Sequence, residues 1–243
     1  MKSKKASNVE FVVSFVLFIT FVVFIYVLID YRINIAGSKE NSLKNLEQEI
    51  LPMLSGNLTE TSVNVNSPGG QACFLFNGFL AATVPGNNIL AKDSSGKVLP
   101  VYVSSDSQSI YIDRAGDAGA KFFRVDSSQE FHAATVSSLT GCASLEQGAG
   151  YTIGTSRQDS YVLESKVLSL FNNYSSNYSN VKRILNVSSR DDFGFAFTYG
   201  NGTRIQTAGN LTASVTVNAE RMPVTYVVSS SGTDQGFLDV MVW

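Results

Sequence analysis

The chain has 243 residues, a formal net charge of −2 and 44% hydrophobic residues, with two cysteines and one histidine. A chain of this length can bury one large core or two small ones. Its slightly acidic balance offers no basic surface for nucleic acid or anionic headgroups, so nucleic acid is excluded as an expected partner.

An uncharged apolar run, Phe11 to Ile29, follows a lysine-bearing N-terminus. At about 1.5 Å per residue, a helix of this length can just cross a bilayer core of about 30 Å. Because positive flanks stay in the cytoplasm, we expect a cytoplasmic leader over 1–10 and a transmembrane helix over 11–29. The expected localisation is the cell membrane, single-pass, with an extracellular C-terminal domain and membrane lipid as a partner.

Two alternatives compete with a membrane anchor at this apolar run. A cleaved secretory signal usually has a shorter apolar region, of about 7–15 residues, that ends in a small-x-small site. A buried core helix of a soluble protein is seldom apolar all the way round. Both alternatives therefore fit the run less well than a transmembrane helix does.

Residues 30–61 are expected to form an amphipathic helical stalk. Its helical pattern covers Ser38 to Leu51, where apolar residues recur at helical spacing among charged ones, and Pro52 is expected to end the helix. The apolar stripe is Leu43, Leu46 and Ile50. This stripe can pack on the β domain, which is the favoured interpretation, or against a helix of a partner subunit.

Residues 62–147 are expected to form a first β subdomain. The segments 88–92 and 97–103 flank Asp93-Ser94-Ser95-Gly96, whose composition is typical of a hairpin turn. Other apolar or alternating runs are 73–76, 79–80, 109–113 and 121–125. Short strands separated by turn residues predict an antiparallel β-sandwich-like subdomain.

Residues 148–243 are expected to form a second, α+β subdomain. The glycine-rich segment 148–154 is interpreted as a linker, and Asp159 or Ser160 as the cap of a helix. That helix has the apolar stripe Leu163, Val167, Leu170, Phe171 and Tyr174. Alternating strands at 193–199, 213–219, 224–228 and 238–242 predict an antiparallel meander. The expected fold class is mainly β with α (α+β), with one or two packed amphipathic helices.

Cys73 and Cys142 form an isolated pair in the region expected to be extracellular. Such a pair indicates a disulfide, which for a loop of this size stabilises the fold by roughly 4 kcal/mol. The alternative is two free buried thiols. A zinc site would need more Cys or His ligands at short spacing, and His132 has no such neighbours, so no metal is expected.

Six asparagines stand in N-glycosylation sequons, and none of the sequons has proline in the middle. They are Asn57, Asn173, Asn177, Asn186, Asn201 and Asn210. A chain rich in Asn, Ser and Thr produces some sequons by chance. If the host glycosylates exported proteins, these asparagines must lie on accessible surface.

The sequence holds little that points to catalysis. A histidine-based triad would have to use His132, and no Gly-x-Ser-x-Gly elbow surrounds a serine. Carboxylate pairs leave no local motif, but the Asp and Glu residues here are scattered. We expect a non-enzymatic protein without a cofactor.

The segment Lys4 to Phe11, together with the apolar run, resembles the class III signal peptides of archaeal type IV pilin-like proteins. In that family a basic leader precedes a small or polar cleavage region, and a glutamate stands just ahead of the helix, as Glu10 does here. The resemblance implies processing near Lys5, Ala6 and Ser7, where this chain lacks the glycine that precedes the helix in the family. It also implies that Glu10 pairs with the new amine of a neighbouring subunit, although a carboxylate solvated at the membrane edge is the alternative.

Two classes of function follow from these observations. The first is a pilin-like subunit with a role in surface structure or filament assembly, whose partners are copies of itself or other pilin-like subunits. The second is a membrane-anchored, or cleaved and secreted, adhesion or glycan-binding β protein. The two classes differ in whether the apolar helix packs on other helices or lies in lipid alone.

Overall fold

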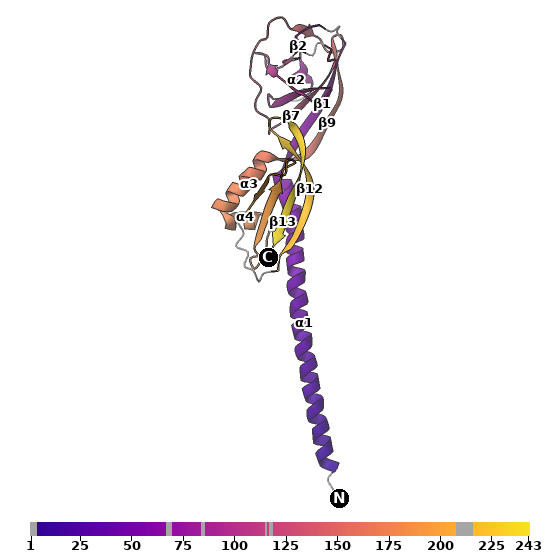
Figure 1. Ribbon diagram of the computed structural model, residues 1–243, viewed down its shortest axis with the longest axis vertical. Helices are drawn as coiled ribbons and strands as arrows, with labels where there is room; N and C mark the ends of the chain where they lie inside the picture. Colours follow the sequence, from indigo (N-terminus) through magenta and orange to yellow (C-terminus); the bar gives the residue numbers. More distant parts are fainter. Residues whose placement is uncertain (1–3, 67–69, 84–85, 115, 117–118, 208–215) are drawn as a thin grey trace.

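The computed structural model describes residues 4–66, 70–83, 86–114, 116, 119–207 and 216–243, and of 4–10 and 29–38 the backbone only. The molecule is elongated: a long N-terminal helix leads into a head made of strands and short helices (Figure 1). We call the part of the head beside this helix the proximal lobe, and the part farthest from the N-terminus the distal lobe. The mixed α+β class predicted from the sequence is confirmed.

The helices are α1 Lys4–Leu54, α2 Phe79–Ala82, α3 Glu164–Ser176 and α4 Tyr178–Ile184. The first strands are β1 Ser55–Val65, β2 Cys73–Phe76, β3 Ile89–Asp93, β4 Val98–Leu99, β5 Val101–Val103, β6 Ile110–Asp113 and β7 Phe122–Ser128. The remaining strands are β8 Ala143–Leu145, β9 Tyr151–Leu163, β10 Phe193–Thr198, β11 Arg204–Gln206, β12 Asn218–Val228 and β13 Gly232–Val242.

These strands form a nine-stranded sheet in the order β11-β10-β13-β12-β9-β1-β7-β3-β4, and a four-stranded sheet in the order β5-β6-β2-β8. The larger sheet passes through both lobes, because β1 and β9 connect the distal strands to β12. A single sheet therefore crosses the boundary expected near residue 148. The finer prediction of two β-sandwich-like subdomains stays a prediction.

Helix α1 is continuous, so the apolar run and the amphipathic segment are one helix rather than two. It does not end at Pro52: the helix continues to Leu54, and β1 starts at the next residue, within the expected stalk. A proline removes one backbone donor and crowds the turn before it, and here the helix ends two residues later. The Ser55 hydroxyl donates to the carbonyl of Leu51 at 2.6 Å and satisfies one acceptor of that last turn.

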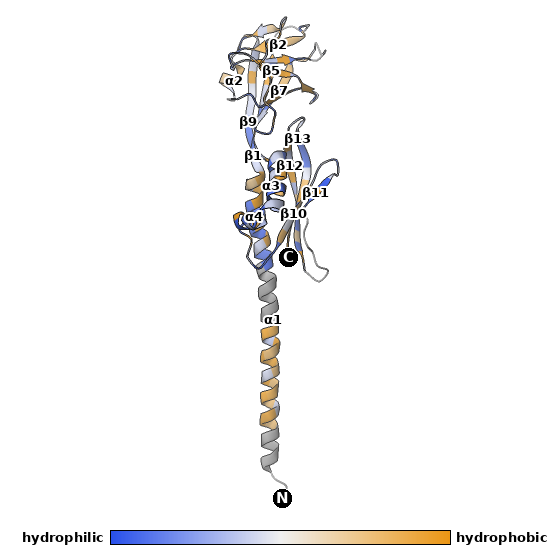
Figure 2. Cartoon of the chain, turned by 90° about the vertical axis from the view of Figure 1, so that its left-hand side faces the viewer, coloured by the Kyte–Doolittle hydropathy of each residue, from blue (hydrophilic) through white to orange (hydrophobic). Residues whose placement is uncertain are grey.

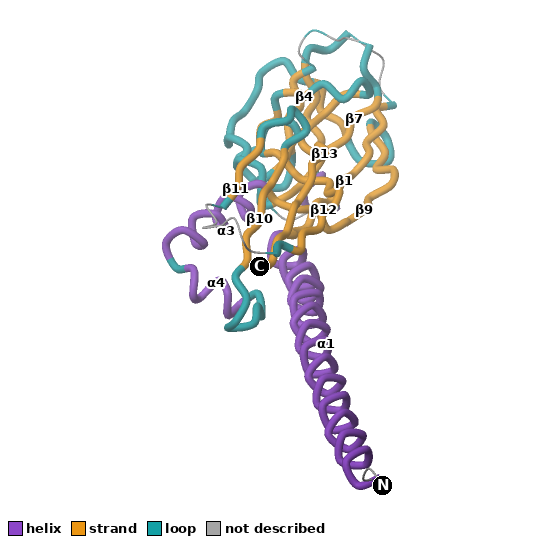
Figure 3. Tube along the Cα trace, turned by 60° about the horizontal axis from the view of Figure 1, so that its bottom comes forward, coloured by secondary structure: helices purple, strands orange, loops and turns teal. Residues whose placement is uncertain are grey.

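Each lobe has its own hydrophobic core. The proximal core joins α1, α3 and α4 to the inner faces of β10, β12 and β13, and its largest members are Tyr174, Tyr226, Phe193, Phe195 and Phe197. The distal core joins strands of both sheets around Phe74, Phe76, Phe79, Phe123 and Tyr151. Neighbouring rings in both cores meet mostly edge to face, a favourable geometry for aromatic pairs. Figure 3 shows α3 and α4 grouped at one side of the proximal lobe, apart from the projecting part of α1.

A third, small cluster lies where the lobes meet, formed by Leu58, Leu90, Phe131, Leu163 and Val227. Beside it the buried ammonium of Lys92 lies 3.2 Å from the carboxylate of Asp126, which Arg124 also contacts at 3.0 Å. Gly232, in the β12–β13 hairpin, covers this ion pair so closely that an added Cβ would lie 2.1 Å from the Lys92 nitrogen. The hairpin of the proximal lobe is thus seated on strands of the distal lobe.

Two expectations for the middle of the chain are wrong. The segment 148–154 is not a linker: Gly148 and Gly150 form a tight turn, and Tyr151 begins β9 with its side chain fully buried. Because β9 runs to Leu163, helix α3 starts at Glu164 rather than near Asp159. The predicted stripe of this helix is confirmed for Val167, Leu170 and Tyr174, which are buried, and for Phe171, which is partly buried against the proximal core. Leu163, the first residue of that stripe, is the last residue of β9 instead.

The C-terminal strands alternate as predicted, with Leu238, Val240 and Val242 fully buried. Their order differs from a meander, since β13 lies between β10 and β12. The strand expected at 213–219 lies partly outside the described residues, and β12 begins at Asn218. Trp243 exchanges backbone hydrogen bonds with Asp192, so the end of the chain is fixed to the sheet.

Candidate functional site

The N-terminal part of α1 is the most unusual surface of the molecule. Its segment Phe11–Leu28 has a mean hydropathy of 2.9 and none of it is buried. Its large apolar side chains are exposed. Figure 2 shows this part of the helix mostly in the orange of hydrophobic residues. Thr20, one of its few polar residues, donates its hydroxyl to the carbonyl of Val16 at 2.8 Å and so needs no outside partner. This helix is long and apolar enough to span a membrane.

The residues that the family resemblance singled out lie in the first turns of this helix. Lys5, Ala6, Ser7 and Glu10 are all within α1, and Glu10 immediately precedes the apolar segment. Their side chains lie outside what the structure describes. Their roles in processing and assembly therefore stay predictions.

The C-terminal part of α1 is docked on the proximal lobe. Its apolar stripe therefore packs on the β domain, which was the favoured interpretation. Leu46 and Ile50 are fully buried in the proximal core. Next to them the Ser42 hydroxyl donates to the Asp191 carboxylate at 2.6 Å in a buried position. Since the same helix carries the apolar segment, the orientation of the head relative to that segment is set by this packing.

Glu47 lies on the docked face of α1, and the sequence patterns did not single it out as a candidate site residue. Burial, together with a hydrogen bond to and repulsion from Glu220 of β12, raises the pKa of Glu47 to about 7, although Lys44 opposes the shift. One carboxylate oxygen of Glu47 is buried without a hydrogen-bond donor. The available signal was its spacing: Glu47 follows Leu43 by four residues and so falls on the apolar stripe.

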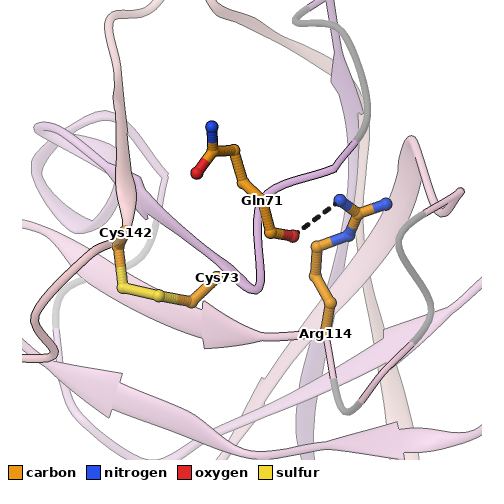
Figure 4. Close-up of a disulfide and its surroundings, with 4 residues drawn as sticks. All are labelled: Gln71, Cys73, Arg114 and Cys142. Carbon is orange, nitrogen blue, oxygen red and sulfur yellow. Dashed lines mark hydrogen bonds between the residues drawn. A yellow bond between two sulfur atoms is a disulfide. The ribbon is translucent and has the colours of Figure 1, made fainter.

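The disulfide predicted between Cys73 and Cys142 is present, with Cα atoms 4.7 Å apart. It ties the start of β2 to the segment before β8, as Figure 4 shows. Close by, the fully buried guanidinium of Arg114 donates to the carbonyls of Gln71 and Ala120 at 2.9 and 3.1 Å. Its carbon lies 4.9 Å from the centre of the Phe74 ring, a cation–π contact that joins this end of the distal lobe to its core.

The sequon asparagines that the structure describes are all exposed. Asn57 lies on β1, Asn173 on α3, Asn177 and Asn186 flank α4, and Asn201 lies in the turn after β10. Asn210 lies outside the described residues. The exposed positions meet the steric requirement for glycosylation, and whether the sequons are used stays a prediction.

Residues suited to catalysis are not brought together in the described part of the chain. His132 is exposed, and within the described residues no group of three or more His, Cys, Asp or Glu side chains could hold a metal ion. Asp126 is held in the buried ion pair with Lys92. The absence of enzymatic activity stays a prediction.

An open groove of about 640 Å³ lies at the end of the proximal lobe where β10, β12 and β13 meet their turns. Its lining includes Tyr199, Gly200, Thr225, Asp234, Gln235 and Phe237. Phe237 is 42% exposed, while the Tyr226 hydroxyl donates to Asp234 at 3.1 Å behind it. The groove thus combines an exposed aromatic ring with hydrogen-bonding groups.

Comparison with protein-family models, with curated proteins and with solved structures found no match to this chain.

Proposed function

We propose that this chain is a non-enzymatic, single-span surface protein of the pilin-like kind, with a role in surface structure or filament assembly. In this proposal the leader is cytoplasmic, the segment Phe11–Leu28 crosses the membrane or packs on other helices, and the head is extracellular. The docked part of α1 then fixes the head to the membrane-spanning part of the same helix.

A single observation carries this proposal: one unbroken helix has an apolar half with no buried side chain and a half that is built into the core of the head. An uncovered apolar surface of this size is unstable in water and requires lipid or other apolar helices. At about 1.5 Å per residue the 51-residue helix is about 75 Å long. Such a helix can serve both as a membrane anchor and as the packing element of an assembly.

The orientation can be tested with a cysteine introduced at the exposed Ser94, in the turn between β3 and β4. A membrane-impermeant maleimide added to intact cells is expected to label Ser94→Cys. Labelling of this cysteine only after cell lysis would place the head inside the cell and refute the proposal.

The assembly role can be tested through Glu10. Glu10→Gln keeps the size of the side chain but removes its charge, so we expect normal membrane insertion and reduced incorporation into surface filaments. The matched control is Glu49→Gln, which removes an exposed carboxylate from the docked part of the same helix. A mature protein that retains Met1 or Lys2 by N-terminal sequencing, with no high-mass surface assembly, would leave only the anchored-protein role.

A second candidate is adhesion by glycan binding, favoured by the groove at the end of the proximal lobe. An exposed ring beside carboxylate, amide and hydroxyl groups is suited to stack on a sugar and bond its hydroxyls. The full chain in detergent can be tested on an array of oligosaccharides, comparing Phe237→Ala with Phe122→Ala, which removes a similarly exposed ring from the distal lobe. Binding that both variants lose equally, or no binding at all, would exclude this role for the groove.

A further inference from the structure

Strand β9 has one open edge. On one side it pairs with β1 along its length, from Tyr151 to Val162. On the other side β12 pairs with it only through Val162 and Leu163. Figure 1 shows β9 at the margin of the distal lobe, with no strand beyond it. Residues 152–161 therefore have no neighbouring strand on this side among the described residues.

The other sheet edges differ from this one. The edge strands β4, β5, β8 and β11 are each three residues or shorter. The unpaired stretch of β12 lies beside α1, whose Lys39 ammonium reaches the carbonyl of Thr216. A long open edge is a template on which another strand can add, because alternate backbone N–H and C=O groups point outward.

The side chains of this edge do little to block such pairing. The stretch 152–161 contains no proline and no lysine, and it is rich in threonine and serine. Its charged residues are Arg157 and Asp159, which form an ion pair at 2.5 Å within the strand. Arg157 keeps 71% of its side chain exposed, so its guanidinium remains available to a second carboxylate.

The two charges distinguish between the ways in which two copies could pair. A parallel pair in which equivalent residues face each other would set Arg157 against Arg157 and Asp159 against Asp159, which is repulsive. In an antiparallel pair with Gln158 facing its own copy, Arg157 of each chain faces Asp159 of the other. The antiparallel register is therefore self-complementary in charge, and two-fold symmetry makes both ion pairs at once.

We propose that the open edge of β9 pairs antiparallel with β9 of a second copy of this chain, with Gln158 on the two-fold axis. Since β9 runs roughly along the long axis of the molecule, this pairing points the two α1 helices in opposite directions (Figures 1 and 2). The paired copies would then be anchored in two facing membranes. The inference is independent of filament assembly, which would use α1.

Disulfide trapping in the full chain, in detergent micelles, tests the register. Under mild oxidation we expect Gln158→Cys to form a covalent dimer. Ser160→Cys alone is expected to stay monomeric, whereas a mixture of Ser156→Cys and Ser160→Cys chains is expected to cross-link. Gln235→Cys, on an exposed residue of β13 in the proximal lobe, is the control and should not cross-link. Efficient cross-linking of Ser160→Cys to itself, or none with Gln158→Cys, would overturn the proposal.

A charge exchange tests the same contact without cysteines. Arg157→Asp and Asp159→Arg each place like charges opposite each other, so each variant alone is expected to lose self-association at least tenfold. Mixing the two variants restores both cross-strand ion pairs and is expected to restore association between unlike chains. If each variant associates as the wild type does, or the mixture does not recover, the antiparallel register is wrong.

Clustering of liposomes tests whether the two α1 helices point in opposite directions. Liposomes that carry the full chain are expected to cluster, and clustering should be lost with Arg157→Asp and regained when liposomes of the two charge variants are mixed. Cross-linking confined to copies within one liposome would contradict the opposed arrangement. Reduced filament incorporation of Glu10→Gln with intact clustering would separate this inference from the proposed function.

Discussion

The two lobes of the head build their hydrophobic cores from different elements. The distal core is built from strands and the short helix α2, and a disulfide closes a long loop across it. The proximal core has no disulfide among its described residues, and takes Leu43, Leu46, Ile50 and Leu54 from α1 instead. The comparison teaches that the distal lobe is complete without the anchor helix, whereas the proximal lobe depends on it. Four sets of substitutions test this difference.

The largest effect is expected from removing the disulfide. Cys73→Ser with Cys142→Ser releases a loop with a sequence separation of 69 residues, and should lower the free energy of unfolding by about 4 kcal/mol. Trp243, the sole tryptophan, lies in the proximal lobe and reports on that lobe alone. We expect the circular-dichroism transition to shift to lower temperature more than the Trp243 fluorescence transition. Equal shifts of both signals would show that the lobes unfold as one unit.

The converse effect is expected from Leu46→Ala. This side chain is fully buried between α1 and the proximal sheet, and removing it should cost about 3 kcal/mol through lost burial and the cavity left behind. The Trp243 fluorescence transition should now shift to lower temperature more than the circular-dichroism transition. Leu168→Ala, which truncates a leucine 44% exposed on α3, is the control and should change stability by less than about 0.5 kcal/mol. A small effect of Leu46→Ala would mean that the proximal lobe does not need the helix.

The contact between the lobes can be tested with a pair of glycine substitutions. Gly232 and Gly96 both have a positive φ, of 88° and 85°, but an added Cβ meets only open space at Gly96 and the Lys92 ammonium at Gly232. Gly96→Ala should cost about 1 kcal/mol for backbone strain. Gly232→Ala should cost about 2 kcal/mol, since it also displaces a buried ion pair, and should separate the two melting transitions. Identical costs in urea unfolding would show that the hairpin can move away freely.

The smallest effect concerns the docked face of α1. The pKa of Glu47 is raised from its ordinary 4.5 to about 7, so its protonated form stabilises the fold below about pH 4.5 and this contribution is lost as pH rises towards 7. Glu47→Gln should therefore be more stable than the wild type at pH 8, by about 1 kcal/mol because water reaches the site, and equal to it below pH 4.5. The exposed Glu49→Gln is the control. A stability difference that does not change with pH would disprove this account.

Local patterns predicted much of this fold. The apolar run depends on local composition, and the stripe of α1 and the alternation in β10 and β13 depend on the periodicity of the chain, which the structure confirms. The turn at 93–96 was also predicted correctly: the Asp93 carboxylate accepts bonds from the backbone of Ser95 and Lys97, and Gly96 provides the positive φ. These features are set by residues close in sequence, so sequence reasoning can reach them.

The expectations that were wrong depended on contacts between distant residues. The segment 148–154 looks like a linker by composition, yet Gly154 lies so close to β1 that an added Cβ would be 2.5 Å from the Ser62 hydroxyl, which would have to move. The placement of β13 between β10 and β12, and the buried Lys92–Asp126 pair, likewise have no local signature. Of the candidate site residues, the sequence could predict the cysteine pair and the apolar segment. The open edge of β9 becomes visible only once its partners are known.

The direct passage from Leu54 of α1 to Ser55 of β1 has a mechanical consequence. No loop separates the two elements, and β1 lies inside the large sheet between β7 and β9. A pull on α1 that exceeds its packing in the proximal core is therefore transmitted lengthwise along β1, so the hydrogen bonds to both neighbouring strands are loaded together in shear instead of opening one after another. A load applied through the apolar part of α1 meets the head along its most resistant direction.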